Sequence, residues 1–140
     1  MISMSFRRGL KTMFNTHRWL FDTNLLLWYR TADPRLPVDV KKEIEESNGK
    51  KYISIASAWE LAIKTSIGKL TIVGGIEAFW RDFSSAGFIW LPISIDTIKI
   101  VETLPFYHKD PFDRILVASS IEHSLELLAT DEIFAQYKKL

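Results

Sequence analysis

Short apolar runs alternate with amphipathic stretches along this sequence from Trp19 onward. This alternation is typical of βα units, in which strands form a mainly parallel sheet and helices cover its faces. With 140 residues, 47% of them hydrophobic, the chain is long enough to bury one core of this kind. We therefore predict an α/β protein with a mainly parallel central sheet, folded as a single domain over residues 19–140.

The expected elements follow from where each apolar run starts and stops. Pro111 suits the first position of a helix because its missing N–H is not needed there, and Ser94 suits a helix N-cap. We expect strands at 19–21, 52–55, 88–91 and 125–129, and helices at 24–29, 38–46, 58–67, 76–85, 95–103, 111–123 and 131–139.

The first 18 residues differ from the rest of the chain in charge. They contain four of the 18 basic residues and no acid, so the other 14 against 17 acids give residues 19–140 a net charge of −3. These four are Arg7, Arg8, Lys11 and Arg18. The segment lacks the apolar core of a signal peptide, and we expect a mobile basic lead, with Met13 as an alternative natural start. A nucleic-acid function must then depend on a local patch.

Several classes of protein are excluded by composition. The longest stretch without Asp, Glu, Lys or Arg runs from Phe83 to Ile95 and is too short for a membrane span, which needs about 18 apolar residues. The absence of cysteine excludes disulfide frameworks, thiolate metal sites and a cysteine nucleophile, and we expect a cytoplasmic protein. Gly74 and Gly75 are not followed by the Gly-Lys-Ser/Thr of a phosphate-binding loop.

Acidic residues occur where the expected strands end. Asp22 and Asp131 directly follow the first and last strands, Glu60 lies one turn into the helix after the second strand, and Asp113 lies in the first turn of a later helix. Ligands of parallel α/β sheets bind beyond the carboxyl ends of the strands, so these acids could converge there. Carboxylates repel unless a cation compensates them, and an all-oxygen donor set suits Mg²⁺ or Mn²⁺.

Each acid also has a structural interpretation. Glu60 follows Ser57 by three residues and fits a capping box. Acids at the start of a helix commonly act as N-caps or interact with the helix dipole, which applies to Asp22, Asp110, Asp113 and Asp131. Taken singly, each acid is more typical of a structural role than of a catalytic one. His17, His108 and His123 have no spacing typical of a metal site or a catalytic triad.

Four short blocks occur in a fixed order: LFDTN at 20–24, SAWELAIK at 57–64 with GKL at 68–70, HKDPFDR at 108–114, and ATDE at 129–132. Together they resemble the PIN-domain family, and specifically VapC-type toxins of bacterial toxin–antitoxin pairs. The likeness covers residues 19 to about 137, and the basic lead is its main departure. It implies a three-layer α/β/α sandwich and a metal-dependent endoribonuclease that a cognate antitoxin inhibits.

The resemblance also implies roles for particular residues. The acidic quartet that binds Mg²⁺, or Mn²⁺ in its place, and hydrolyses RNA phosphodiester bonds corresponds to Asp22, Glu60, Asp113 and Asp131. Around it, Thr130 and Thr23 are expected to donate hydrogen bonds to a carboxylate ligand or a metal-bound water. Lys64 and Arg114 are expected to contact RNA or the antitoxin, with a surface ion pair as an equally weighted alternative.

Aromatic residues are abundant for a chain of this size, and we expect a homodimer that covers some of them, such as Trp28, Tyr29 and Trp80. The alternative to an enzyme is a catalytically silent PIN-like domain that acts by binding a partner. A receiver-like phospho-switch is disfavoured, because no pair of adjacent acids follows the first strand and no lysine follows the last one.

Overall fold

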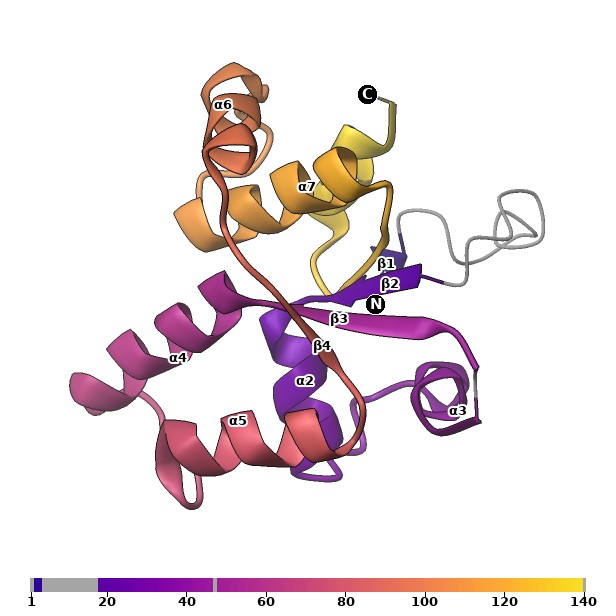
Figure 1. The fold of residues 1–140 in the computed structure, drawn as a ribbon, viewed down its shortest axis with the longest axis vertical. Coiled ribbons are helices and arrows are strands. Elements are labelled where there is room, and N and C mark those ends of the chain that lie inside the picture. Colours follow the sequence, from indigo (N-terminus) through magenta and orange to yellow (C-terminus); the bar gives the residue numbers. More distant parts are fainter. Residues whose placement is uncertain (1, 4–17, 47, 140) are drawn as a thin grey trace.

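The central feature of the fold is a five-stranded sheet in the order β1-β5-β2-β3-β4. Figure 1 labels the strands β1 to β4. The computed structural model describes residues 2–3, 18–46 and 48–139. Strands β2 (Arg18–Phe21), β3 (Lys50–Ser54), β4 (Ile89–Leu91) and β5 (Glu126–Ala129) run parallel, whereas β1 (Ile2–Ser3) pairs antiparallel with β5. The predicted mainly parallel sheet is therefore confirmed.

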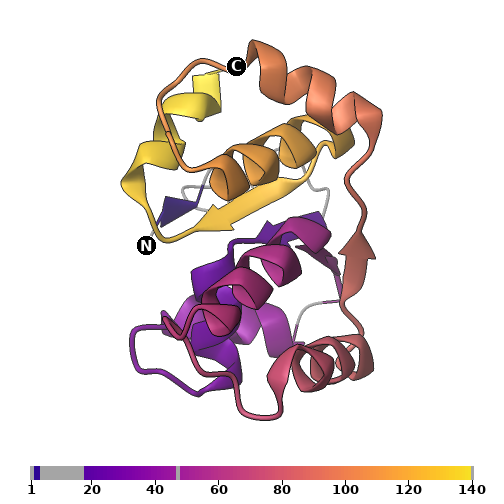
Figure 2. The same cartoon turned by 90° about the vertical axis from the view of Figure 1, so that its left-hand side faces the viewer.

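Helices cover both faces of the sheet. Side chains alternate along β2, so that Trp19 and Phe21 enter one core while Leu20 enters the other. The first core includes side chains from α2 (Thr23–Arg30), α3 (Val38–Glu46), α4 (Ile55–Ser66) and α5 (Gly75–Ser85). Across the sheet lie α6 (Ile95–Thr103), α7 (Pro111–His123) and the 3₁₀ helix η1 (Glu132–Lys139) (Figure 2). This arrangement confirms the predicted three-layer α/β/α sandwich.

Most predicted elements agree with the structure to within a few residues, and the largest shift is at the start of α4. The strand predicted at 52–55 ends at Ser54, whose Oγ accepts a hydrogen bond from the Ala56 N–H (3.0 Å) and caps α4. The capping box proposed for Ser57 and Glu60 is therefore wrong, because both residues lie inside the helix. The last helix is 3₁₀ instead of α.

The basic lead is described only in part. Ile2 and Ser3 form β1, so at these two positions a sheet strand replaces the expected mobile segment. Arg18 begins β2, and its Nη1 donates a hydrogen bond to the His123 carbonyl (3.1 Å). Met13 and the cations between residues 4 and 17 lie outside the described residues. Within the described part of the chain, no helix has the length and apolar character needed to cross a membrane.

The order of the strands brings the ends of β5, β2 and β3 side by side. The chain passes from β2 to β3 and β4 through helices on one face, then crosses the other face through α6 and α7 to reach β5 on the far side of β2. A change of direction of this kind leaves a crevice at the carboxyl edge of the sheet. Directly after β2, the Asp22 N–H donates to the Leu128 carbonyl (2.9 Å) and continues the ladder to this edge.

Candidate active site

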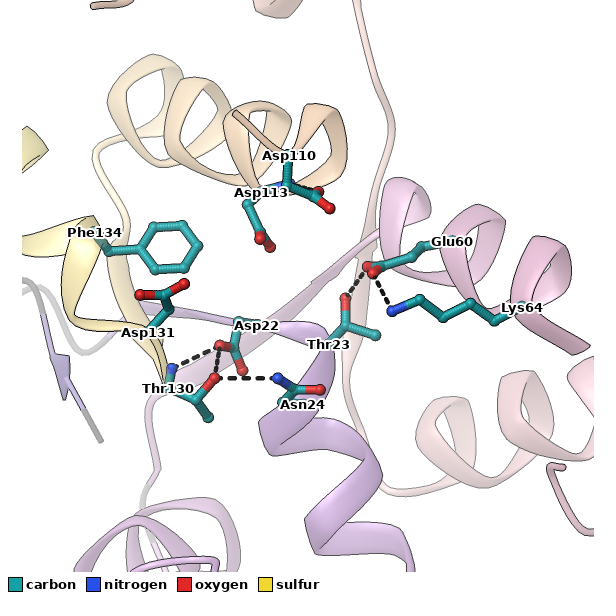
Figure 3. A pocket seen from close by; sticks show the side chains of 10 residues that line it. All are labelled: Asp22, Thr23, Asn24, Glu60, Lys64, Asp110, Asp113, Thr130, Asp131 and Phe134. Atoms are coloured by element: carbon teal, nitrogen blue, oxygen red, sulfur yellow. Dashed lines mark hydrogen bonds and ion pairs between the residues drawn. The ribbon is translucent and has the colours of Figure 1, made fainter. Parts of the chain in front are cut away.

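A polar pocket of about 140 Å³ opens at the carboxyl edge of the sheet (Figure 3). The four predicted acids line it, and they come from the ends of β2 and β5 and from helices α4 and α7. The remaining lining residues are Thr23, Asn24, Lys64, Asp110, Thr130 and Phe134. Residues that lie more than one hundred positions apart in the sequence therefore share one small cavity.

Asp22 lies at the base of this pocket and is almost fully buried. Its Oδ1 accepts the Leu25 N–H (2.9 Å) and so caps α2, while its Oδ2 accepts the backbone N–H (2.7 Å) and the hydroxyl (3.0 Å) of Thr130. Asp22 therefore both caps α2 and lines the pocket. Burial raises the pKa of Asp22 to about 6, and the charge of Glu60 adds to the rise, although the three hydrogen bonds oppose it.

Glu60 enters the pocket from the second turn of α4 and is also buried. Its Oε1 accepts the Thr23 hydroxyl (2.9 Å), which lies at the same distance from Ser57 Oγ. Its Oε2 forms an ion pair with Lys64 Nζ (2.8 Å), one turn along the helix. Lys64 is the cation that lines the pocket, and its side chain is 45% exposed, so it can reach a bound molecule.

Asp113 projects from the first turn of α7, which Asp110 caps by accepting the N–H groups of Phe112 (2.9 Å) and Asp113 (3.0 Å). Burial raises the pKa of Asp113 to about 7. The charges of the nearby carboxylates raise it further, in the order Asp110, Glu60, Asp22 and Asp131. The acids therefore share one electrostatic field and repel one another.

Asp131 completes the quartet beyond β5. Its Oδ1 accepts the Ile133 N–H (3.0 Å) at the start of η1, and half of its side chain is exposed. Asn24, which sequence analysis did not single out, also borders the pocket, and its Nδ2 donates to Thr130 Oγ1 (3.3 Å). Exposed lining residues therefore come from the turn after β5 and from α2.

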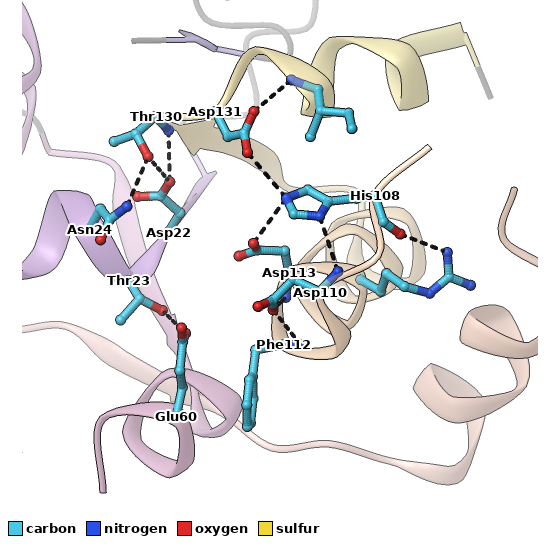
Figure 4. Close-up of polar contacts among 12 residues, drawn as sticks. Asp22, Thr23, Asn24, Glu60, His108, Asp110, Phe112, Asp113, Thr130 and Asp131 are labelled. Carbon is cyan, nitrogen blue, oxygen red and sulfur yellow. Dashed lines mark hydrogen bonds and ion pairs between the residues drawn. The ribbon is translucent and has the colours of Figure 1, made fainter. Parts of the chain in front are cut away.

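His108 is the other residue that sequence analysis missed. Its Nε2 lies 3.0 Å from Asp113 Oδ2 and 3.4 Å from Asp131 Oδ2, and its Nδ1 accepts the Asp110 N–H (3.2 Å) (Figure 4). A search for regular spacing could not find it, because Asp131 lies far along the chain. The available signal was its place at the head of the 108–114 block.

Arg114 is not among the residues that line the pocket. Its guanidinium is buried and donates to the carbonyl oxygens of Pro105 (3.0 Å), Val101 (3.1 Å) and Leu104 (3.3 Å). Its Cζ also lies 4.0 Å from the centre of the Phe106 ring. With its donors used in this way, Arg114 holds the loop between α6 and α7, and its expected contact with RNA or an antitoxin stays a prediction.

The donor set of the pocket suits a hard divalent cation. Its carboxylate and hydroxyl oxygens are the ligands that Mg²⁺ and Mn²⁺ prefer, and a cation would offset the burial and the repulsion that raise the pKa values of Asp22 and Asp113. Within residues 2–3, 18–46 and 48–139, no three His, Asp or Glu side chains are arranged to hold a metal ion as they stand.

Comparison with known proteins gives the same assignment as the sequence blocks. No curated protein matches the sequence. A chain in the crystal structure of VapBC2 from Rickettsia felis, bound to a DNA fragment from their promoter, has a similar fold, with a TM-score of 0.67 and 16% identity. The match covers 87% of this chain and 94% of that chain, and at this identity it concerns the fold alone. The PIN domain family matches residues 19–140, which confirms the predicted family: the chain belongs to the PIN domain family.

Proposed function

We propose that this protein is a Mg²⁺-dependent endoribonuclease of the VapC toxin type. The observation that carries the proposal is the convergence of Asp22, Glu60, Asp113 and Asp131 in one pocket with raised pKa values for Asp22 and Asp113. Such an arrangement costs stability unless the site binds a cation, so it favours a functional role. Membership of the PIN domain family supports the same proposal.

In this proposal Asp22, Asp113 and Asp131 hold the cation, and Glu60 is a further ligand or orients the attacking water. When bound, Mg²⁺ supplies a water of lowered pKa and charge stabilisation at the phosphate, and Mn²⁺ is a plausible substitute. Thr130 and Thr23 orient carboxylates, since each donates a hydroxyl hydrogen bond to one of the acids. Lys64 is placed to contact the phosphate that is cleaved or the antitoxin.

The partners belong to the same proposal. The structural relative comes from a VapBC2 complex, which supports a cognate antitoxin that blocks the pocket and a cytoplasmic setting. A homodimer is proposed because Trp80 remains 45% exposed and stacks on Trp90 (4.3 Å between ring centres), while Trp28 and Tyr29 are only partly buried against the core. Sedimentation equilibrium at high concentration tests the dimer, and a chain that stays monomeric contradicts it.

The decisive experiment incubates the purified chain with total RNA and maps new ends, with and without Mg²⁺. We expect cleavage that needs the metal and that Asp22→Asn abolishes, because this change removes the charge and keeps the size of the side chain. Asp96→Asn is the matched control, since Asp96 lies on the exposed start of α6 away from the pocket.

The alternative is a catalytically silent domain that retains the acids but acts by binding a partner. It predicts no new RNA ends under any metal condition. A wild-type chain that binds Mn²⁺ in calorimetry and leaves RNA intact would favour this alternative over the enzyme.

A further inference from the structure

The loop between α6 and α7 delivers one imidazole to the acidic pocket. His108 Nδ1 accepts the backbone N–H of Asp110 (3.2 Å), so the lone pair of the ring lies on Nδ1 and the proton lies on Nε2. This assignment follows from the hydrogen bond, since a proton on Nδ1 would face another N–H. The N–H of the imidazole therefore points away from its own loop.

Two carboxylates from different elements lie next to this N–H. Asp113 Oδ2, on α7, is 3.0 Å from Nε2, and Asp131 Oδ2, beyond β5, is 3.4 Å from it (Figure 4). Nε2 is buried, and neither contact is aligned as a hydrogen bond, so the atom has no hydrogen-bond partner among the described residues. A polar atom in this state favours small movements of the two acids toward it.

The position of His108 is fixed on every side. The backbone N–H of His108 donates to Tyr137 Oη (2.9 Å), and the Tyr137 hydroxyl in turn donates to the Pro105 carbonyl (2.6 Å). The ring of His108 packs against Phe134, with 5.1 Å between the ring centres, and only 12% of the side chain is exposed. Arg114 binds the carbonyls of the same loop. The imidazole is thus a fixed donor, to which the carboxylates adjust.

We propose that His108 is a positioning residue that holds Asp113 and Asp131 in the orientation that receives the divalent cation. This inference rests on the proposed function, because it assigns a role within the same site. An N–H between two carboxylates attracts both, so it limits their mutual repulsion and restricts their rotation. Partners of this kind around metal ligands change metal affinity by about 10- to 100-fold when they are removed.

The geometry also separates this role from direct ligation. As a ligand, Nε2 would need a free lone pair, and the proton would have to move to Nδ1, where the Asp110 N–H already donates. His108 therefore acts through the two acids. Its effect on a bound cation is expected to be graded, whereas loss of a ligand such as Asp113 is expected to remove most of the binding.

The test compares Mn²⁺ binding by calorimetry in the full-length wild type and in His108→Ala, His108→Gln, Asp113→Asn and His123→Ala. Gln keeps an N–H donor near the position of Nε2, and His123 is a matched control, since its ring contacts Glu122 outside the pocket. We expect about tenfold weaker Mn²⁺ binding for His108→Ala, recovery for His108→Gln and no change for His123→Ala. For RNA cleavage, kcat should fall in His108→Ala while KM stays the same.

Each outcome decides one of the two proposals. If the wild type binds no Mn²⁺, the proposed function fails first. If the wild type and His108→Ala bind Mn²⁺ equally while Asp113→Asn does not, the site stands and the role of His108 is refuted. Should the Ala variant unfold, long-range ¹H–¹⁵N spectra of the wild type with and without Mg²⁺ decide: a proton on Nε2 in both states supports positioning, and its loss on loading would mean direct ligation.

Discussion

Glu122 and the acids of the pocket have similar side chains and opposite surroundings. At the contact of α6 with α7, Glu122 accepts the hydroxyls of Thr97 and Ser94, and His123 Nε2 lies 3.2 Å away. These donors, Thr97 first, hold the pKa of Glu122 below its usual value. In the pocket the pKa values of Asp22 and Asp113 rise instead, because burial and neighbouring charges outweigh the donors.

The difference shows how to distinguish an acid that stabilises the fold from one that serves a site. Glu122 has a donor for each oxygen, so its charge is favoured in the folded state. The five acids of the pocket also accept backbone N–H and hydroxyl groups, but Lys64 is the one lysine or arginine among the described residues that line it. Such a group costs stability in the folded state, because burial and mutual repulsion disfavour its charges, and groups of this kind are typical of functional sites.

The largest expected effect is on cleavage. Asp113→Asn should lower the rate of Mg²⁺-dependent RNA cleavage by about 1,000-fold, because the charge that holds the cation is lost. Glu122→Gln, which changes the compensated acid in a similar way, should leave the rate within about twofold of the wild type. Single-turnover cleavage of one RNA by both purified variants measures the contrast, and equal losses would mean that the two acids do not differ in role.

The same comparison can be made for two cations, the buried Arg114, which donates to backbone carbonyls, and Lys64 in the pocket. Arg114→Ala leaves the carbonyls of Val101, Leu104 and Pro105 without this donor and should lower the free energy of unfolding by about 3 kcal/mol. Lys64→Ala, at the pocket cation, should change it by less than about 1 kcal/mol, because that ion pair is half exposed. Urea unfolding measures both; a neutral Arg114→Ala would return Arg114 to the surface role expected from sequence.

The raised pKa values of Asp22 and Asp113 predict how the stability of the metal-free protein changes with pH. The raised pKa values of Asp22 and Asp113, about 6 and about 7, mean that the folded state binds protons more tightly than the unfolded one. The cost in stability of keeping these two carboxylates charged is full above about pH 7. It is relieved as the pH falls toward their pKa in the unfolded state, near 4. In EDTA, we expect the free energy of unfolding to rise by about 1 to 2 kcal/mol from pH 8 to pH 5.5.

Asp113→Asn is the control for this trend. It should be more stable than the wild type at pH 8 and should show a flatter pH profile, because the group that titrates is gone. Saturating Mn²⁺ should reverse the wild-type trend, since a cation favours the charged carboxylates. A wild-type profile that is flat or rises with pH in EDTA would contradict the raised pKa values.

Sequence analysis predicted most of the fold because periodicity and turn residues act locally. The helices at 38–46, 95–103 and 111–123 agree with the structure to the residue, and the strand ends placed the four acids at one edge. The capping box considered as the structural alternative for Glu60 is wrong because α4 begins after Ser54, the last residue of β3, which caps it.

The surroundings of His108 and Arg114 could not be predicted for a different reason. Both residues lie next to site acids in the sequence, but their roles depend on the path of the loop between α6 and α7. Arg114 follows Asp113 by one residue, which turns its side chain about 100° around the helix, away from the pocket and into the loop. Because that loop is fixed by long-range bonds to Tyr137, no local pattern could show that the histidine, and not the arginine, approaches the acids.

The smallest expected effect comes from removing residues 1–16. The deletion takes away β1, a two-residue edge strand, and leaves β5, β2, β3 and β4 with the ends that position the four acids. The family match also begins at residue 19. We expect Mg²⁺-dependent cleavage to stay within about threefold of the full chain, because the loss of Arg7, Arg8 and Lys11 removes only non-specific attraction for RNA. Cleavage that is lost on truncation, but kept in a folded Asp22→Asn protein, would place the chemistry in the basic lead. The contrast between Glu122 and the acids of the pocket would then have no bearing on function.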